Sequence, residues 1–420
     1  MREMKDSGLK WIGKIPSSWN VMPNKYLMKK KKVICPVYKG EDILSLTMKG
    51  VIVRDLDAGG KMPTSFDGYQ RLEPGNLLMC LFDIDVTPRC IGLIKQAGLS
   101  SPAYSQFELN DMGNAEYYCY YYTMLDNDKT LLHLAKNLRH SLTEDQLGAI
   151  SVIVPPVQEQ KKIADFLDAK CSEIDALSAD IQTQIDILEQ YKRSVITEAV
   201  TRGLNPDVEM KDSGTPWCPL IPIHWKYANP KALFTQRLDR AYPGDKQLTA
   251  SQEYGVIYQD EYMELTGTKI VTVMKDFSIL KHVEPNDFVI SMRSFQGGLE
   301  YSERRGSISS AYVMLIPNNE YVYPPFYRWF FKSSKYINAI QSTSNLVRDG
   351  QAMRYANFAQ VPLFIIPLDE QKQISEYLDE KVRKIDEILK SKNNQLEILA
   401  EYKKSLIYEY VTGKKEVPSI

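Results

Sequence analysis

Tyr191-Lys-Arg-Ser-Val-Ile-Thr-Glu-Ala-Val-Thr201 recurs in this chain as Tyr402-Lys-Lys-Ser-Leu-Ile-Tyr-Glu-Tyr-Val-Thr412. Each copy closes a long helical pattern that opens with Glu-Gln-Lys-x-Ile, at Glu159–Ile163 and again at Glu370–Ile374. A repeat of this length indicates a duplicated structural unit. The chain is therefore expected to hold two tandem units of roughly 210 residues, each ending in a long helix.

A shorter duplication precedes each half. Glu3-Met-Lys-Asp-Ser-Gly8 recurs at Glu209–Gly214, and the Trp-x-x-x-Ile-Pro-x-x-Trp opening of Trp11–Trp19 recurs at Trp217–Trp225. Between these markers and the helices lie short alternating apolar stretches separated by Gly and Pro, a pattern typical of strands and turns. We therefore expect two globular regions that share a fold and differ in their loops, where recognition residues concentrate.

The expected fold class is α+β, with two globular α/β recognition domains in tandem repeat, separated by two long helices that pair as an antiparallel coiled coil. The predicted boundaries are 1–156 for the first domain, 157–204 for the first helix, 205–366 for a linker and the second domain, 367–414 for the second helix, and 415–420 for a tail.

The helical segments carry a heptad repeat. Pro155, Pro156 and Pro367 lie just before them, followed by acidic first turns that favour a helix start. Spacing of 3-4-3-4 predicts a coiled-coil seam. About 22 residues of it would span roughly 33 Å, close to one turn of B-DNA. The predicted seam positions are Ile174, Leu177, Ile181, Gln184, Leu188, Tyr191 and Val195, and in the second copy Ile385, Ile388, Lys392, Gln395, Leu399, Tyr402 and Leu406.

Three of these seam positions are polar, namely Gln184, Gln395 and Lys392. They are either tolerated defects or residues that fix the register of the pair at a cost in stability, and the sequence leaves both interpretations open.

Composition argues for a cytoplasmic protein. The formal net charge is −1, no apolar run approaches the length of a membrane span, and the start of the chain lacks a secretory signal. The six cysteines show no metal-ligand spacing and are interpreted as reduced thiols. A net charge near zero weighs against nucleic-acid binding unless positive charge is concentrated locally.

Motifs of catalysis are missing. There is no Gly-x-x-x-x-Gly-Lys-Ser/Thr loop for ATP. Tyr323-Pro-Pro-Phe326 lacks the polar residue that an adenine methyltransferase turn needs, and the acidic residues of Pro206–Lys211 lie too close together for a nuclease site. Four scattered histidines do not suggest acid–base or metal chemistry. We expect no enzyme activity, no catalytic residue and no metal site in this chain.

The candidate DNA contacts are polar, basic or aromatic side chains in loops beside predicted strands, where base edges and phosphates can be reached. The loop Ser291–Gly298 also contains glycines that would let the backbone approach a ligand closely. The same residues are also consistent with ordinary turns and solvated surface positions. The candidates are Lys49, Arg89, Tyr104 and Arg139 in the first domain, and Ser251, Gln252, Tyr254, Arg293, Ser294, Gln296, Tyr312, Arg348 and Arg354 in the second.

The helix entrances Pro155–Ala164 and Ile366–Ile374 resemble the specificity subunits of type I restriction–modification enzymes. The paired-tryptophan openings and the Gly-x-x-Ser-x-Ala-Tyr segments, Gly98–Tyr104 and Gly306–Tyr312, resemble that family too. The resemblance implies two target-recognition domains that each read half of a split site in double-stranded DNA. It also implies two methyltransferase subunits as partners, with restriction subunits in the full complex. S-adenosylmethionine, ATP and Mg²⁺ would be held by those partners, and this chain would carry no cofactor.

Two alternatives remain beside a DNA-specificity subunit. An interaction scaffold with duplicated domains would suit the weak net charge, and it would lack the steep salt dependence of phosphate contacts. A stand-alone nuclease or methylase would require turnover by the pure chain, which the missing motifs oppose.

Overall fold

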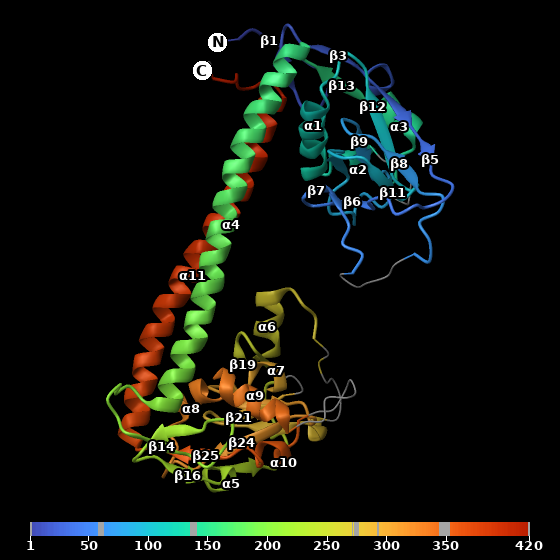
Figure 1. Ribbon diagram of the computed structural model, residues 1–420. Helices are drawn as coiled ribbons and strands as arrows, with labels where there is room; N and C mark the ends of the chain where they lie inside the picture. The colour runs from blue at the N-terminus through green and yellow to red at the C-terminus, as the bar shows by residue number, and fades with distance from the viewer. Residues whose placement is uncertain are drawn as a thin grey trace. The chain divides into compact units, whose positions relative to one another are not determined.

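The computed structural model describes residues 2–57, 63–134, 141–270, 272, 277–291, 294–343 and 353–418. The chain divides into two compact units, one formed by Met1–Gln182 with Asn394–Ile420 and the other by Thr183–Asn393. Each unit contains one globular region and a segment of both long helices, α4 (Val157–Arg202) and α11 (Leu368–Val411) (Figure 1). The two halves of the sequence are therefore also two units in space, although each unit borrows a helix segment from the other half.

The globular region of the first unit is built on a four-stranded antiparallel sheet in the order β10-β9-β12-β4. These strands are Ile91–Leu93, Leu77–Met79, Ser105–Leu109 and Met28–Lys31. A three-stranded sheet, β11-β8-β5, and three two-stranded ribbons, β1-β2, β13-β3 and β6-β7, complete it. Their bounds are β1 Met4–Asp6, β2 Lys14–Pro16, β3 Asn20–Pro23, β5 Val33–Ile34, β6 Leu44–Thr47, β7 Gly50–Val53, β8 Gln70–Leu72, β11 Gly98–Ser100 and β13 Ser151–Val154, with helices α1 Ala115–Asn127, α2 Thr130–Leu134 and α3 Glu144–Ala149.

Within the described residues, the second unit repeats this plan except for β5, which has no corresponding strand. Its main sheet has the order β17-β24-β21-β22, formed by Phe234–Arg237, Val313–Pro317, Phe288–Ile290 and Glu300–Tyr301. Four two-stranded ribbons of the second unit correspond to strand pairs of the first. They are β14-β15, β16-β25, β18-β19 and β20-β23, which correspond in that order to β1-β2, β3-β13, β6-β7 and β8-β11. Their bounds are β14 Met210–Asp212, β15 Leu220–Pro222, β16 Lys226–Ala228, β18 Leu248–Ser251, β19 Gly255–Tyr258, β20 Lys281–Val283, β23 Gly306–Ile308 and β25 Leu363–Ile365, with helices α5 Pro230–Leu233, α6 Gln259–Thr266, α7 Ser294–Gly297, α8 Pro324–Phe330, α9 Ser334–Ser342 and α10 Tyr355–Phe358.

The repeated glycines Gly98 and Gly306 have a common steric cause. A Cβ on Gly98 would lie 2.7 Å from the carbonyl oxygen of Asp42, and one on Gly306 would lie 2.4 Å from that of Lys246. In both units a neighbouring segment crosses the strand too closely for a side chain. The repeat of the Gly-x-x-Ser-x-Ala-Tyr segment therefore reflects packing of the shared fold.

Buried tyrosines fill the core behind the first sheet. Tyr117, Tyr118, Tyr121 and Tyr122 on α1 are all fully buried. The hydroxyl of Tyr117 donates to the carbonyl of Val411 at 2.7 Å, and that of Tyr118 donates to the carbonyl of Ile153 at 3.0 Å. Burial raises the pKa of Tyr117 and Tyr118 well above the ordinary value, so both stay neutral donors. The high tyrosine content thus serves the core of this unit.

The same device recurs in the second unit, where the hydroxyl of Tyr327 donates to the carbonyl of Phe364 at 3.1 Å. The segment that follows β24 forms two helices, α8 and α9, with a break between them. The break lies at Ser333, which is buried, has extended backbone angles and donates its hydroxyl to the carbonyl of Phe330 at 2.7 Å. Ser333 occupies the N-cap position of α9, where serine is common, but its hydroxyl bonds the preceding turn and does not cap α9.

The Glu-Gln pair that opens α4 is fastened to the first globular region. The carboxylate of Glu159 accepts a hydrogen bond from Trp19 Nε1 at 2.9 Å. Gln160 is fully buried, and its side-chain nitrogen donates to the carbonyls of Met112 and Pro155, each at 2.8 Å. Its side-chain oxygen accepts from the backbone N–H of Asn114 at 2.7 Å. One buried amide thus joins the helix to two loops of the domain.

The second copy makes the same contacts. Glu370 accepts from Trp225 Nε1 at 3.0 Å, and buried Gln371 donates to the carbonyls of Tyr321 and Ile366 at 2.8 Å. The oxygen of Gln371 accepts from the N–H of Tyr323 at 2.8 Å. The repeated tryptophan and the repeated Glu-Gln pair are therefore two halves of one joint, built twice.

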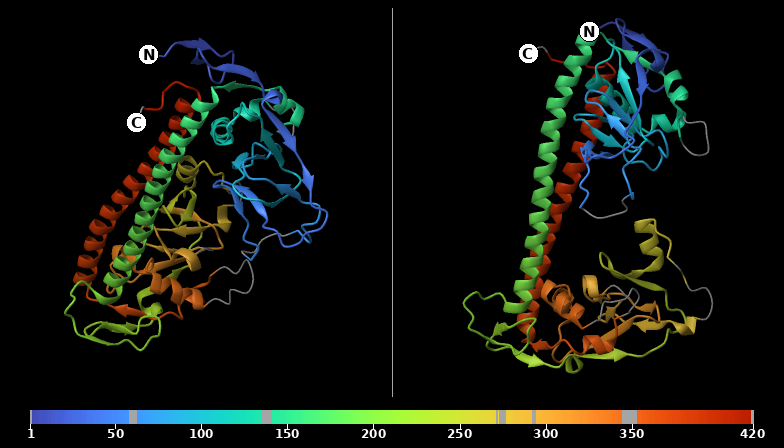
Figure 2. Two further views of the ribbon diagram at one scale, coloured as in Figure 1. Left: turned by 45° about the horizontal axis from the view of Figure 1, so that its top comes forward. Right: turned by 45° about the vertical axis from the view of Figure 1, so that its right-hand side comes forward.

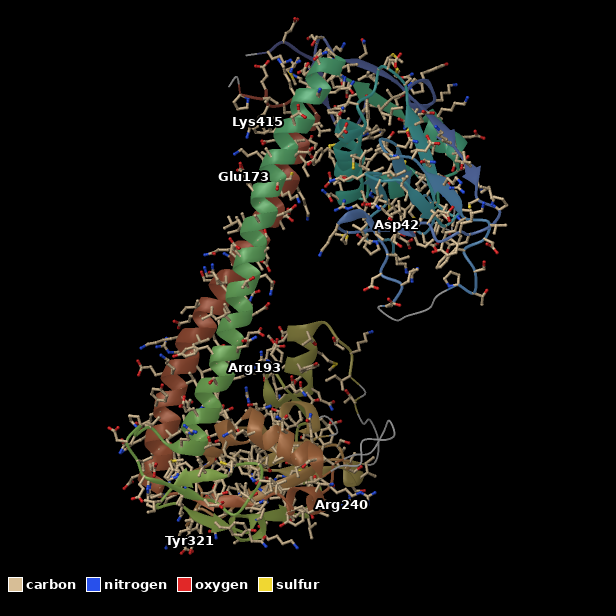
Figure 3. All side chains as sticks on the ribbon, viewed as in Figure 1. Asp42, Glu173, Arg193, Arg240, Tyr321 and Lys415 are labelled. Carbon is tan, nitrogen blue, oxygen red and sulfur yellow. The ribbon has the colours of Figure 1, made fainter. Side chains whose placement is uncertain are left out.

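The two long helices lie side by side and run antiparallel in each unit (Figures 1 and 2). In the first unit Lys403 Nζ lies 2.6 Å from Asp175 Oδ1, and the rings of Phe166 and Tyr410 are 4.5 Å apart. In the second unit Lys192 Nζ lies 2.5 Å from Asp386 Oδ1. Charged side chains such as Glu173 and Arg193 project outward from α4 (Figure 3). The pairing expected from the heptads is present.

The seam of the pair differs from the predicted one at alternate positions. Ile174, Ile181 and Ile385 are buried, and Leu188, Val195, Lys392 and Leu399 are partly buried. Leu406 is buried as well. The positions predicted between them are exposed: Leu177, Gln184, Tyr191, Ile388, Gln395 and Tyr402. Their places are taken by the next residue in each case, which is Ser178, Ile185, Lys192, Leu389, Leu396 and Lys403.

The globular cores explain this choice of side. Leu167, Cys171 and Ile174 of α4 belong to the core of the first unit, and Ile196 and Val200 belong to the core of the second. Continuing the 3-4 spacing from these anchored ends selects Ser178, Ile185 and Lys192. The exposure of Gln184 and Gln395 removes them as seam residues, so they cannot fix its register.

No helix of the described residues is long and apolar enough to cross a membrane.

Candidate functional site

Each unit has a groove between its globular region and its pair of helices. The first groove has a volume of about 690 Å³ and is lined by the β6-β7 hairpin, β10, α1 and the segments of α4 and α11 in that unit. The second groove, about 650 Å³, is lined by the equivalent β18-β19 hairpin, β22, α8 and the helix segments of the second unit. The two grooves are built alike because both follow from the duplicated fold.

Matching contacts mark the helix side of both grooves. The hydroxyl of Tyr120 donates to Asp168 Oδ1 at 2.7 Å in the first groove. In the second groove the indole nitrogen of Trp329 donates to Asp379 Oδ1, also at 2.7 Å. The ion pairs Lys403–Asp175 and Lys192–Asp386 lie along the same walls. The globular regions are thus held to the helices by polar contacts at the edge of each groove.

The charge of the two grooves differs. The first is lined by five cationic and three acidic side chains, and the second by four cationic and five acidic ones. Part of the difference lies at a repeated position, since Gly92 of β10 corresponds to Glu300 of β22. A Cβ on Gly92 would meet Leu46 and Val51 at 2.8 Å, whereas Glu300 is buried and pairs with Lys332 at 2.6 Å. In the second groove the carboxylate of Glu300 therefore neutralises the charge of Lys332. The first groove has no carboxylate at the corresponding position, which is Gly92.

Two of the predicted DNA contacts in the first unit lie in the first groove. Lys49 is exposed at the turn of the β6-β7 hairpin. Arg89 is mostly buried and bonds Asp126 at 3.2 Å and Asn127 at 3.0 Å, so its guanidinium already has partners. Tyr104 is half-buried and its ring stacks on Phe82 at 6.1 Å. Arg139 lies outside the described residues.

In the second unit Gln252 and Tyr254 are exposed and line the second groove. Ser251 is half-buried, and its hydroxyl accepts from the N–H of Glu253 at 3.3 Å, which closes the hairpin turn. The ring of Tyr254 packs edge-on against Tyr262. These three candidates are therefore together on one hairpin, the counterpart of the hairpin that carries Lys49.

The remaining candidates of the second unit are scattered. Ser294 is buried and accepts from the N–H of Ser291 at 2.8 Å, which makes it a structural residue of α7 and corrects its prediction as a DNA contact. Gln296 belongs to α7, but its side chain lies outside the described residues, as do Arg293 and Arg348. Tyr312 is half-buried beside a small apolar cluster, and Arg354 is exposed at the start of α10.

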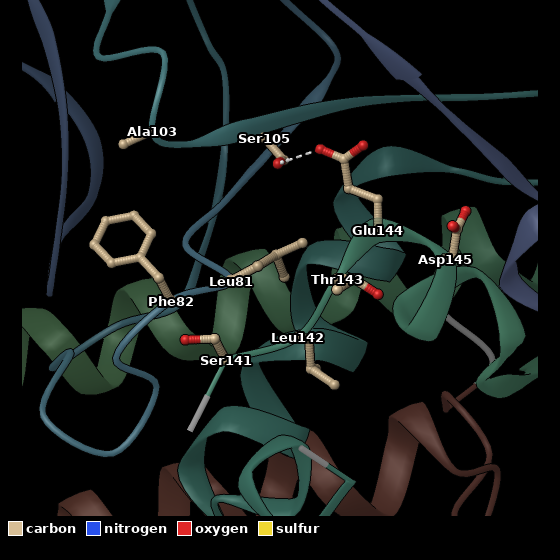
Figure 4. A pocket seen from close by; sticks show the side chains of 9 residues that line it. All are labelled: Leu81, Phe82, Ala103, Ser105, Ser141, Leu142, Thr143, Glu144 and Asp145. Carbon is tan, nitrogen blue, oxygen red and sulfur yellow. Dashed lines mark hydrogen bonds between the residues drawn. The ribbon is translucent and has the colours of Figure 1, made fainter. Parts of the chain in front are cut away.

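A smaller pocket of about 430 Å³ lies beside α3 in the first unit (Figure 4). Its wall includes Phe82, Ser105, Glu144 and Asp145. The hydroxyl of Ser105 donates to Glu144 at 3.1 Å, and Glu144 also pairs with Lys30. Two carboxylates at its edge make this pocket unsuited to a phosphate group.

An apolar stripe lies on the opposite side of the helices from the grooves. Leu177 follows Asp168 by nine residues, which is two and a half helical turns, so the two side chains point in opposite directions. We call this surface the outer stripe. It consists of Leu177, Ile398 and Tyr402 in the first unit and of the repeated Ile388, Ile187 and Tyr191 in the second, all between 45% and 58% exposed.

No group of three His, Cys, Asp or Glu residues that could hold a metal ion occurs among the described residues. Burial raises the pKa of Cys119 to about 11 and that of Cys90 to about 12, so both thiols are protonated and weakly nucleophilic.

Comparison with known proteins finds a family model that matches part of the first half of the chain. The family model of the type I restriction modification DNA specificity domain matches residues 101–186. A putative type I restriction enzyme MjaX specificity subunit from Methanocaldococcus jannaschii is 23% identical over 283 residues, and the EcoBI specificity subunit from Escherichia coli is 22% identical over 274. These matches cover 66% and 62% of this chain, and 62% and 57% of the relatives' own lengths.

Solved structures share the fold over almost the whole chain. A chain from a structure of the type I R-M system has a TM-score of 0.69, with 12% identity, over 96% of this chain and 99% of that one. The HsdS subunit from Thermoanaerobacter tengcongensis has a TM-score of 0.50, also with 12% identity, over 96% and 98%. The resemblance to type I specificity subunits and the α+β fold with paired long helices are thereby confirmed.

Proposed function

We propose that this chain is the non-catalytic DNA-specificity subunit of a type I restriction–modification complex, with each globular region reading one half of a bipartite site. The observation that carries the proposal is the duplication of a fold in which every strand but β5 recurs, and whose first copy matches the model of a DNA specificity domain over residues 101–186. Two similar readers in one chain suit a site with two specific blocks. Their hairpins differ at the exposed positions, with Lys49 in one and Gln252 and Tyr254 in the other, as two different half-sites would require.

The unread spacer between the blocks would be set by the long helices. Because α4 and α11 are antiparallel and continuous over 46 and 44 residues, their length is a natural determinant of the distance between the readers. The joints at Gln160 and Gln371 support this role, since each fixes a helix start to its own domain through three hydrogen bonds.

The outer stripe supports docking of two methyltransferase subunits. A water-exposed row of Leu, Ile and Tyr on a helix pair favours burial by apolar side chains of a partner. The stripe occurs once in each unit at equivalent positions, so two copies of the same partner are expected. Catalysis, S-adenosylmethionine, ATP and Mg²⁺ would then belong to partner subunits.

Selection from a random duplex library tests the proposal. The chain, bound to its modification subunits, should enrich two short sequence blocks at a fixed separation, with affinity that falls steeply as salt rises. Lack of enrichment together with salt-insensitive retention of protein partners would favour an interaction scaffold instead.

A further inference from the structure

The first groove carries two cations whose charge is not used inside the protein. Lys49 and Lys95 are both exposed and line the groove, and within the described part of the chain neither is paired with a carboxylate. By contrast, Lys403 is bound to Asp175 and Arg89 to Asp126 in the same groove. A pair of free lysines on one groove favours an anionic occupant.

The two lysines come from different elements that are packed together. Lys49 is at the hairpin turn and Lys95 follows β10. The absence of a side chain on Gly92 lets β10 pack against Leu46 and Val51 of that hairpin, where a Cβ would approach within 2.8 Å. The hairpin and the strand therefore present their lysines from a rigid support, which reduces the entropic cost of binding.

The second groove lacks both charges at the equivalent positions. The Gly50 and Gly255 repeat aligns Lys49 with Tyr254, and the Gly98 and Gly306 repeat aligns Lys95 with Glu303. Tyr254 and Glu303 both line the second groove. The duplicated fold therefore offers an internal comparison in which one groove attracts anions and the other does not.

The outer stripe limits what the occupant of the groove can be. An apolar protein partner has its surface on the opposite side of the helices, at Leu177, Ile398 and Tyr402. The groove side carries five cationic and three acidic side chains, and it faces the globular region that carries the candidate base contacts. The occupant best suited to free lysines beside a DNA reader is the sugar–phosphate backbone of the same duplex.

We propose that the first groove, through Lys49 and Lys95, holds phosphates of the DNA backbone next to the half-site read by the first domain, and that the second groove does not. This inference rests on the proposed function and adds an asymmetry to it. The first domain gains sequence-independent affinity from its groove, while the second depends more on its direct contacts.

The test uses the full chain bound to its modification subunits and a labelled random-sequence duplex of about 30 base pairs, because phosphate contacts do not depend on sequence. Affinity is measured between 50 and 200 mM salt for Lys49→Ala, Lys95→Ala and the double variant. Lys14→Ala, an exposed lysine on β2 outside both grooves, is the matched control. Glu303→Gln examines the second groove.

Each lysine-to-alanine change should reduce the magnitude of the slope of log affinity against log salt by about 0.9. If only counterion release is lost, this corresponds to a loss of affinity of about eight-fold at 0.1 M salt. The double variant should lose about 1.8 from the slope. Lys14→Ala and Glu303→Gln should match the wild type. If the variants of Lys49 and Lys95 behave like Lys14→Ala, the groove assignment is overturned while the proposed DNA binding stands. Tighter DNA binding by Glu303→Gln would also overturn the assignment, because it would show that the second groove approaches the DNA backbone. A wild-type complex without salt-dependent binding would instead refute the proposed function itself.

Discussion

Replacing Gln160 with Leu removes the amide that joins α4 to the first globular region. Leucine keeps much of the side-chain volume, so the main change is the loss of three hydrogen bonds, to the carbonyls of Met112 and Pro155 and from the N–H of Asn114. An unpaired buried polar group costs about 1–3 kcal/mol. Because a carbonyl left unpaired costs less than an N–H, the expected total is about 3 kcal/mol for the first unit.

Hydrogen exchange read by mass spectrometry reports this loss locally. A destabilisation of about 3 kcal/mol lowers protection at the start of α4 by roughly a hundred-fold. Gln371→Leu should produce the same loss at the start of α11, because Gln371 makes the same three contacts in the second unit. Gln184→Leu, at an exposed position of α4, is the control and should change stability by less than about 0.5 kcal/mol. Protection in Gln160→Leu equal to that in Gln184→Leu would refute the joint as described.

Three further predictions concern the helices and the core. Tyr402→Ser and Tyr191→Ser each remove one copy of an exposed aromatic side chain of the outer stripe, so each should weaken the binding of one methyltransferase subunit by about 2 kcal/mol, measured by calorimetry. Binding of two subunits with the affinity of the wild type would contradict this. Inserting three heptads into each helix lengthens the helix by about 31 Å, which is close to one turn of DNA, so the selected spacer should grow by about nine base pairs. An unchanged spacer would exclude the helices as its determinant. Tyr117→Phe removes the hydrogen bond to the carbonyl of Val411 and should lower the free energy of unfolding of the first unit by about 1 kcal/mol, measured by urea unfolding. An unchanged free energy of unfolding would show that this bond does not contribute to stability.

Repeats made the architecture predictable from sequence. The Glu-Gln entrances, the paired tryptophans and the closing Tyr-Lys-x-Ser segments together indicated two units and two paired helices, because each repeated motif is part of one physical joint, as Trp19 with Glu159 shows. Repetition could be recognised without knowing the contact that causes it.

Details of the seam could not be predicted, because α4 offers two overlapping 3-4 patterns. Leu177 and Tyr191 made one of them look apolar, while Ser178 and Lys192 made the true one look polar. The choice depends on where the helix ends pack, at Leu167 and Ile196, which the heptad pattern alone does not contain.

The candidate contacts were the least predictable part, since side-chain type does not reveal whether a polar group already has a partner. The hydroxyl of Ser294 accepts a hydrogen bond from the N–H of Ser291 in the same loop, and the guanidinium of Arg89 is paired with Asp126. Lys95, which we propose as a phosphate contact, was not among the predicted residues because it stands alone after a short strand. The signal that could have found it was the comparison of the repeats, where Lys95 stands opposite Glu303.

The most direct test of the central claim is a genome-wide map of methylated adenine in cells with and without the gene for this chain. The account predicts that deletion removes methylation at one split motif, made of two short specific blocks around a fixed unread spacer, and leaves other methylated motifs unchanged. Persistence of every split motif in the deleted strain, when those motifs are methylated by the modification subunits that bind this chain, would contradict it.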